Sequence, residues 1–187
     1  MNFRDYLLQM VNTYGGAKKQ PFGGHPLKQL FTKELPAYLR EVLHPRESIK
    51  IKGSTGTVNW AFIPWLAFMD STETTTTKKG AYVVYLFSED MQNLYLAVMV
   101  GIDLDTSKSP GEREIQAKEI RQLRSFISTL RREEKLDILN ITETARFGNS
   151  TYAKNYADGI AGFVLYNTTN LPPEQVLLND ATTASSS

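Results

Sequence analysis

The first third of the chain carries two apolar patterns with the spacing of an amphipathic helix. Residues 2–14 place apolar side chains at every third or fourth position, and Gly15 and Gly16 are predicted to end this helix. Residues 27–42 repeat the pattern around Pro36. Because proline lacks an amide hydrogen and clashes with the preceding turn, we expect a kink or two short helices there. Both apolar stripes are predicted to face the core.

The middle of the chain changes to patterns typical of β-strands. The four segments with this character are Ser48 to Lys52, Trp60 to Met69, Ala81 to Phe87 and Leu94 to Ile102. Residues 89–93 favour a hairpin turn, which predicts antiparallel pairing of the third and fourth strands. The polar, threonine-rich residues 70–80 predict an exposed loop.

The last third predicts helices and one further strand. From Pro110 onward a single apolar stripe predicts a long helix that carries charges of both signs on its other positions. Residues 136–141 suit a short strand, and residues 160–166 suit either a strand or the start of a buried helix. A final short helix is expected from residue 172 to residue 180. The low-complexity tail, residues 181–187, is expected to be disordered.

Together these elements predict one α+β domain over residues 1–180, with a curved, mainly antiparallel mixed β-sheet flanked by helices. The length of 187 residues suits a single domain. The absence of cysteine excludes a disulfide framework and a thiolate metal site. The N-terminus lacks the apolar core of a signal peptide, and no apolar run approaches the roughly 20 residues that cross a bilayer. We therefore expect a cytoplasmic protein with no membrane partner.

Charge gives only a weak indication of a partner. The net charge of +1 neither favours nor excludes nucleic acid. Residues 1–53 hold nine Lys and Arg against four Asp and Glu. Such a skew is typical either of a side that faces phosphates or of an ordinary solvated surface, and both interpretations stay open.

Enzyme chemistry has little support in the sequence. The chain contains neither a G-x-x-x-x-G-K-[ST] phosphate loop nor a G-x-S-x-G nucleophile motif. Its two histidines, His25 and His44, lack the spacing of metal ligands and are predicted to be structural. Asp103 and Asp105 follow a predicted strand as in some metal-dependent nucleases, but no third acid is placed to join them. We predict no catalytic residue, no metal and no cofactor.

The segment from residue 49 to residue 102 is the most informative part of the chain. Gly53 and Gly56 bracket a tight turn, which permits close backbone approach to a partner or forms a plain strand connection. Both tryptophans, Trp60 and Trp65, follow within a few positions. A tryptophan on an apolar strand is ordinarily core, and Trp65 also suits the wall of an aromatic pocket.

Four sequence blocks occur in a fixed order along the chain. They are G-S-x-G-x-x-N-W-x-x-I-P-W from Gly53, K-G-x-Y-x-V-Y-L-F from Lys79, L-Y-L-x-x-x-x-G-I from Leu94, and R-F-G-N-S from Arg146. Their order and spacing resemble the McrB N-terminal DNA-binding domain family of modification-dependent (type IV) restriction systems. The resemblance covers about residues 1–180.

This resemblance implies a non-catalytic module that recognises modified DNA, such as DNA with 5-methylcytosine, by base flipping. In base flipping a nucleotide leaves the duplex and its base is held in a protein pocket. The resemblance places that pocket on four residues, Trp65, Tyr82, Leu86 and Phe147. Independently, strand alternation points Tyr82 and Leu86 to the same face of a sheet.

The resemblance also assigns a loop that enters the DNA, and this loop departs from the family pattern. It comprises Ser54, Thr55, Thr57, Val58 and Asn59. The family's aromatic wedge aligns near Thr57, where this chain has smaller side chains that fill a vacated stack poorly. Base flipping, and a preference for methylated cytosine over another modified base, therefore stay open.

Further partners follow from the charges and from the resemblance. The lysines that flank the strand ends are candidate phosphate contacts: Lys50, Lys52, Lys78 and Lys79. The resemblance implies double-stranded DNA as the partner, and a GTP-driven AAA+ motor and a nuclease subunit in the complete phage-defence system. Two alternatives remain. One is a protein-interaction module of a defence system that does not bind DNA, and the other is a small nuclease that uses Asp103 and Asp105.

Overall fold

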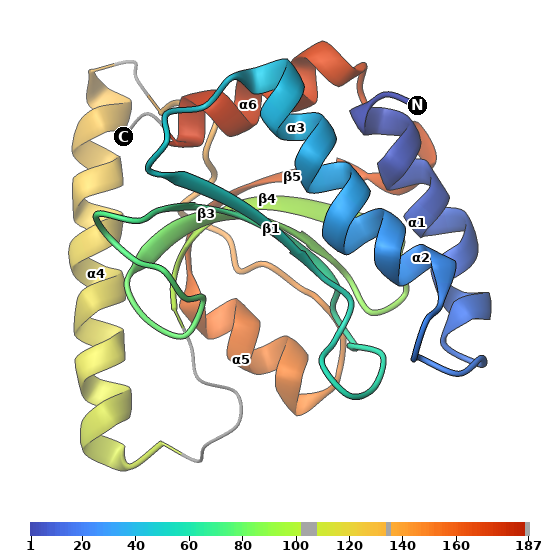
Figure 1. Ribbon diagram of the computed structural model, residues 1–187. Helices are drawn as coiled ribbons and strands as arrows, with labels where there is room; N and C mark the ends of the chain where they lie inside the picture. The colour runs from blue at the N-terminus through green and yellow to red at the C-terminus, as the bar shows by residue number, and fades with distance from the viewer. Residues whose placement is uncertain (102–107, 134–135, 186–187) are drawn as a thin grey trace.

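A five-stranded antiparallel sheet forms the centre of the computed structural model, which describes residues 1–101, 108–133 and 136–185 (Figure 1). Its strands are β1 (Ile49–Ser54), β2 (Trp65–Asp70), β3 (Ala81–Phe87), β4 (Asn93–Val100) and β5 (Ile160–Asn167). They lie in sequence order, and each neighbouring pair is antiparallel. The predicted α+β class is confirmed. Among the described strands no parallel pair occurs, so the sheet is not mixed.

One face of the sheet, called here the covered face, lies under helices. They are α1 (Phe3–Ala17), α2 (Pro26–Gln29), a π-helical turn η1 (Leu30–Glu34), α3 (Leu35–Leu43) and α6 (Glu174–Ser185). Figure 1 shows them gathered on one side of the strands. The strand residues beneath them alternate with residues of the opposite face, as the period of a strand requires. They include Leu66, Phe68, Val83, Tyr85 and Phe87, all of which are buried.

The opposite face, called here the cavity face, has a smaller cover. Helix α5 (Thr151–Gly159) and the preceding residues 141–150 pack over part of it. Helix α4 (Pro110–Arg132) contacts β4, β5 and α5, and its Ile127 belongs to the core of the covered face. The short strand expected at residues 136–141 is reduced to a single bridge between Asn140 and Phe163. The run at residues 160–166 forms strand β5, which settles that prediction in favour of a strand.

Pro36 breaks the second helical stretch as expected. The amide of Leu35 bonds to the carbonyl of Leu30, five residues back, and η1 separates α2 from α3. The prediction that Gly15 and Gly16 end α1 was wrong. The helix continues to Ala17, whose buried side chain packs in the core. The structure likewise differs from the expected tail, since α6 runs through Ser185.

The extension of α6 has a packing reason. Ala181 and Ala184 lie on its buried side at helical spacing, so residues that look like low-complexity tail complete the cover of the covered face. No helix in the described part of the chain is long and apolar enough to cross a membrane.

Candidate functional site

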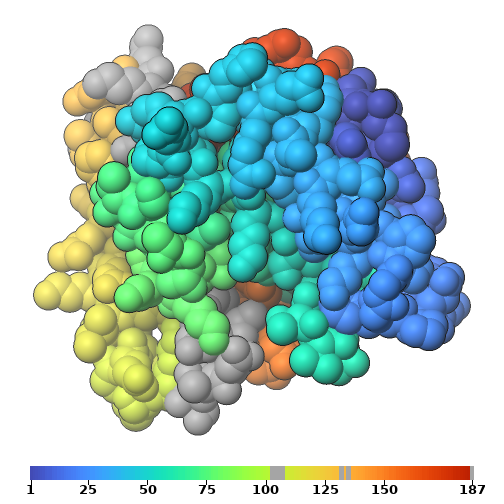
Figure 2. Space-filling model, viewed as in Figure 1, coloured from blue at the N-terminus to red at the C-terminus, as the bar shows by residue number. Residues whose placement is uncertain are grey.

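A cavity of about 570 Å³ opens on the cavity face of the sheet. It is bounded by the β1–β2 loop (residues 55–64), by Thr77 and Lys78 of the β2–β3 loop (residues 71–80), and by Tyr152 and Tyr156 of α5. In the space-filling view the two loops stand as separate projections, and part of α5 is visible between them (Figure 2). The cavity therefore lies where α5 stops covering the sheet.

Strand register builds the floor of the cavity. Trp65 at the start of β2 pairs directly with Leu86 near the end of β3. Tyr82 and Val84 precede Leu86 on β3 at alternate positions, so they share its face. The structure thus brings Trp65, Tyr82 and Leu86, three of the four residues assigned to the pocket, into one cavity lining.

Tyr82 gives this floor an uncharged polar edge. Its hydroxyl donates a hydrogen bond of 3.1 Å to the carbonyl of Thr77. Burial raises the pKa of Tyr82 far above its ordinary value, and the neighbouring Tyr156 raises it further. The hydroxyl is therefore neutral and its proton is used in the bond to Thr77, so Tyr82 adds no charge to the cavity floor.

Phe147, the fourth assigned residue, does not line the cavity. Its side chain is 1% exposed and packs behind the lining, with ring centroids 4.7 Å from Tyr95 and 6.4 Å from Tyr156. Glu89 fixes the backbone around it, because the Glu89 amide donates to the Phe147 carbonyl and the Glu89 carboxylate accepts from Ser150 and from the Asn149 amide. Phe147 supports the position of Tyr156.

The β1–β2 loop is a built feature rather than a loose connection. Gly56 has φ +119°, and a Cβ there would lie 1.9 Å from the Asn59 carbonyl oxygen. The Ala61 amide donates to the Thr55 carbonyl at 2.7 Å, and the Tyr14 hydroxyl of α1 donates to the Ala61 carbonyl at 2.6 Å. The loop therefore needs glycine at position 56 and is attached to the helical layer.

Trp60 anchors the same loop from its middle. Its ring makes edge-to-face contacts with Tyr14, Phe22 and His25, at 5.6, 5.1 and 5.0 Å between centroids. Its indole nitrogen donates to the Gln20 carbonyl at 3.0 Å. This explains why the predicted strand from residue 60 begins only at Trp65: residues 60–64 serve the loop, and Pro64 lacks an amide to extend the ladder.

Of the residues assigned to the DNA-intruding loop, three are solvent-exposed and two are not. Thr57, Val58 and Asn59 form the exposed tip, with Val58 at 78% exposure. Thr55 is fully buried, and Ser54 is half-buried at the end of β1. The close backbone approach that Gly53 permits is to another part of this chain and not to a partner. A Cβ at position 53 would lie 2.1 Å from the Phe31 carbonyl oxygen.

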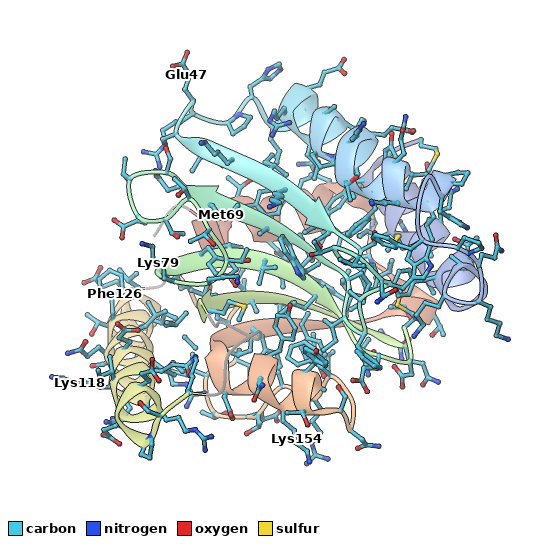
Figure 3. The ribbon with its side chains drawn as sticks, turned by 60° about the horizontal axis from the view of Figure 1, so that its bottom comes forward. Glu47, Met69, Lys79, Lys118, Phe126 and Lys154 are labelled. Carbon is cyan, nitrogen blue, oxygen red and sulfur yellow. The ribbon has the colours of Figure 1, made fainter. Side chains whose placement is uncertain are left out.

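The lysines proposed as phosphate contacts lie on or near the cavity face of the sheet. Lys50 and Lys52 on the edge strand β1 pair with Met69 and Ala67, so they project from the cavity face, and both are exposed. Lys78 lines the cavity itself. Lys79 follows it and lies at the end of the sheet nearest α4 in Figure 3.

Four aromatic residues that the sequence did not assign to the pocket also line the cavity: Trp60, Phe62, Tyr152 and Tyr156. The spacing of four between Tyr152 and Tyr156 places both on one face of a helix, which was a detectable signal. Ser150 caps that helix by accepting a hydrogen bond from the Ala153 amide. Their position opposite Trp65 depends on long-range packing that a single sequence does not reveal.

The described residues contain no group of three or more His, Cys, Asp or Glu side chains placed to hold a metal ion. His25 caps α2 by accepting from the Leu27 amide, and His44 ends α3 in a left-handed conformation. Asp103 and Asp105, on which the nuclease alternative depends, lie outside the described residues.

Comparison with known families agrees with the resemblance in the sequence. A family model described as the MrcB-like, N-terminal domain matches residues 9–184, which is nearly the whole chain. A search of curated proteins finds no match.

Proposed function

The chain belongs to the MrcB-like N-terminal domain family, which supports a DNA-binding module of a restriction system, and from this premise we propose that it recognises a modified base in double-stranded DNA. The modified base leaves the duplex and enters the cavity, where it meets Trp65, Tyr82 and Leu86. The observation that carries this proposal is a single face of the sheet that combines an aromatic cavity with exposed lysines.

The two parts of that face divide the work of DNA binding. Contacts to phosphates position a protein on the duplex but carry no sequence information, which suits Lys50, Lys52, Lys78 and Lys79. The cavity supplies selection, because stacking of one base on an aromatic ring contributes about 1–3 kcal/mol and extrusion costs a few kcal/mol. Two stacking contacts therefore offset most of the cost of extrusion.

The size and polarity of the cavity also limit which substituent the base can carry. A volume of about 570 Å³ lies within the range of pockets that hold drug-sized molecules, so a base with a substituent fits. The apolar floor favours a methyl group, and 5-methylcytosine is the first candidate. In the complete phage-defence system this module delivers its specificity to a GTP-driven AAA+ motor and a nuclease subunit.

A panel of otherwise identical duplexes tests the proposal by fluorescence anisotropy. The duplexes are unmodified, methylated at cytosine or at adenine, hydroxymethylated, and glucosylated. One modified duplex should bind more tightly than the unmodified one, and Trp65→Ala should remove this preference by weakening the preferred complex to about the affinity of the unmodified duplex, because Trp65 lines the floor that meets the modified base. Lys118→Ala on α4 is the control, and it should leave the preference intact (Figure 3).

Two results would count against the proposal. Equal affinity for every duplex would refute recognition of a modified base. No affinity for any duplex would instead favour the protein-interaction module, with the exposed β1–β2 and β2–β3 loops as its contact surface.

A further inference from the structure

Two exposed aromatic rings stack on each other at the rim of the cavity. Phe62 is 52% exposed and Tyr152 is 44% exposed, and both line the cavity. Their ring centroids are 5.5 Å apart and their planes are inclined by 21°, which is a nearly parallel stack. Large apolar side chains clustered in solvent mark an interaction site more often than an ordinary surface. Val58, at 78% exposure, extends the same apolar rim.

The two rings come from separate elements with fixed backbones. Phe62 belongs to the β1–β2 loop, directly after Ala61, whose carbonyl accepts from the buried Tyr14 hydroxyl. Tyr152 lies in the first turn of α5, two residues after the cap Ser150, whose hydroxyl donates to the carboxylate of Glu89. The attachment points are therefore held in place while the exposed rings keep rotational freedom.

The residues of the floor leave a stacking role unfilled. Tyr82 is 6% exposed and Leu86 is 0% exposed, so each presents little surface to a ligand, and Phe147 does not reach the cavity. Trp65 is half-buried. Flat surface that a base can cover is instead offered by Phe62 and Tyr152.

We propose that Phe62 and Tyr152 form an aromatic clamp that receives the extruded base between their faces, while the floor contacts the edge of the base that carries the modification. This proposal rests on the proposed function and deepens it. Successive bases on one strand rise by 3.4 Å, so a base between two rings needs about 7 Å between them. The two rings now stack directly on each other, so their faces have to open by the thickness of one base, roughly 3.4 Å, which rotation of exposed side chains permits.

Charge on the same face favours a nucleic-acid occupant over an apolar peptide. Lys50 and Lys52 project from this face, and Lys78 lies in the cavity lining. A planar neutral group attached to a polyanion satisfies both features at once. An extruded nucleotide is such a group.

The test measures how much DNA affinity each ring contributes when the target base is present and when it is absent. Dissociation constants are measured on the preferred duplex of the panel and on the same duplex with an abasic site at the target position. Phe62→Ala and Tyr152→Ala should weaken binding of the base-containing duplex roughly 5- to 150-fold and leave binding of the abasic duplex unchanged. Tyr152→Phe, which keeps the ring, should bind like the wild type.

Two further variants separate stacking from bulk and from folding. Phe62→Leu retains an apolar side chain without a ring, and it should lose affinity as Phe62→Ala does. Phe126→Ala is the matched control, because Phe126 on α4 is also 52% exposed and lies away from the cavity lining (Figure 3). It should change neither affinity.

The outcomes distinguish this proposal from the proposed function. If the wild-type chain binds every duplex of the panel alike, both proposals fail. If the wild type prefers one modified duplex but Phe62→Ala weakens the abasic complex equally, or weakens neither complex, only the clamp fails. Full recovery of binding in Phe62→Leu would also overturn the clamp, because leucine provides no face for stacking.

Discussion

The two faces of the sheet carry similar apolar and aromatic side chains but differ in how far helices cover them. Between the covered face and its helices the large rings are sealed, since Tyr85 and Phe87 of β3 and Phe3 and Phe31 of the helical layer are all 0% exposed. On the cavity face α5 covers only part of the sheet, and rings such as Phe62 and Tyr152 remain about half exposed at its rim. Strand alternation supplies apolar side chains to both faces, so the extent of helical cover decides which face stabilises the fold and which can bind.

The two tryptophans show a similar contrast, Trp60 in the β1–β2 loop and Trp65 at the start of β2. Trp60 turns toward the helical layer, where three rings surround it and its indole nitrogen is hydrogen-bonded. Trp65, five residues later, turns toward the cavity. Contacts between Trp60 and the helical layer therefore fix the β1–β2 loop, whose other residues line the cavity.

Removal of a sealed ring should have the largest effect. Phe31→Ala deletes a side chain of η1 that is 0% exposed against the covered face and should reduce the free energy of unfolding by about 3–5 kcal/mol. Phe62→Ala, on the exposed rim, should change it by much less, because little buried area is lost. Urea denaturation measures both values, and equal losses would mean that the rim is as structural as the core.

A smaller effect is expected where the loop backbone is strained. Gly56→Ala forces a Cβ to within 1.9 Å of the Asn59 carbonyl oxygen at φ +119°, and it should reduce stability by about 1–3 kcal/mol while it displaces the rim of the cavity. Affinity for DNA should fall even where the variant is fully folded.

Gly16→Ala is the matched glycine control for this loop prediction. It lies inside α1 with no atom within 4 Å of the added Cβ, and should stabilise the fold by about 0.5–1 kcal/mol. Wild-type DNA binding in Gly56→Ala, measured by anisotropy at a temperature where both variants are folded, would show that the loop geometry is not needed.

The sequence predicted the elements whose signals are local. Strand β3 matched its predicted bounds, because an apolar run lies between Gly80 and a hairpin turn. The broken helix around Pro36 followed from the chemistry of proline. The prediction of β2 began too early, since residues 60–63 belong to the β1–β2 loop, where Trp60 anchors to the helical layer and Phe62 is exposed at the cavity rim.

The candidate site was predictable only in part, for a similar reason. Trp65, Tyr82 and Leu86 were assigned from the resemblance, and strand alternation independently placed Tyr82 and Leu86 on one face, which the pairing of Trp65 with Leu86 joins to Trp65. The side of the cavity formed by α5 depends on where that helix packs across the sheet. Tyr152 and Tyr156 were missed for this reason, and Phe147 lies one layer deeper than assigned.

The smallest expected effect concerns the lysines at the edge of the cavity face. Each phosphate contact contributes about 0.9 to the slope of log affinity against log salt concentration on duplex DNA. Lys50 and Lys52 project side by side from the cavity face, so the double variant Lys50→Ala/Lys52→Ala should lower this slope by about 1.8. The preference for the modified base should persist, because phosphates are the same in every duplex of the panel.

Lys118→Ala on α4 should leave the slope unchanged. An unchanged slope in the double variant would show that β1 does not contact the backbone, and would confine the DNA path to the two loops and α5.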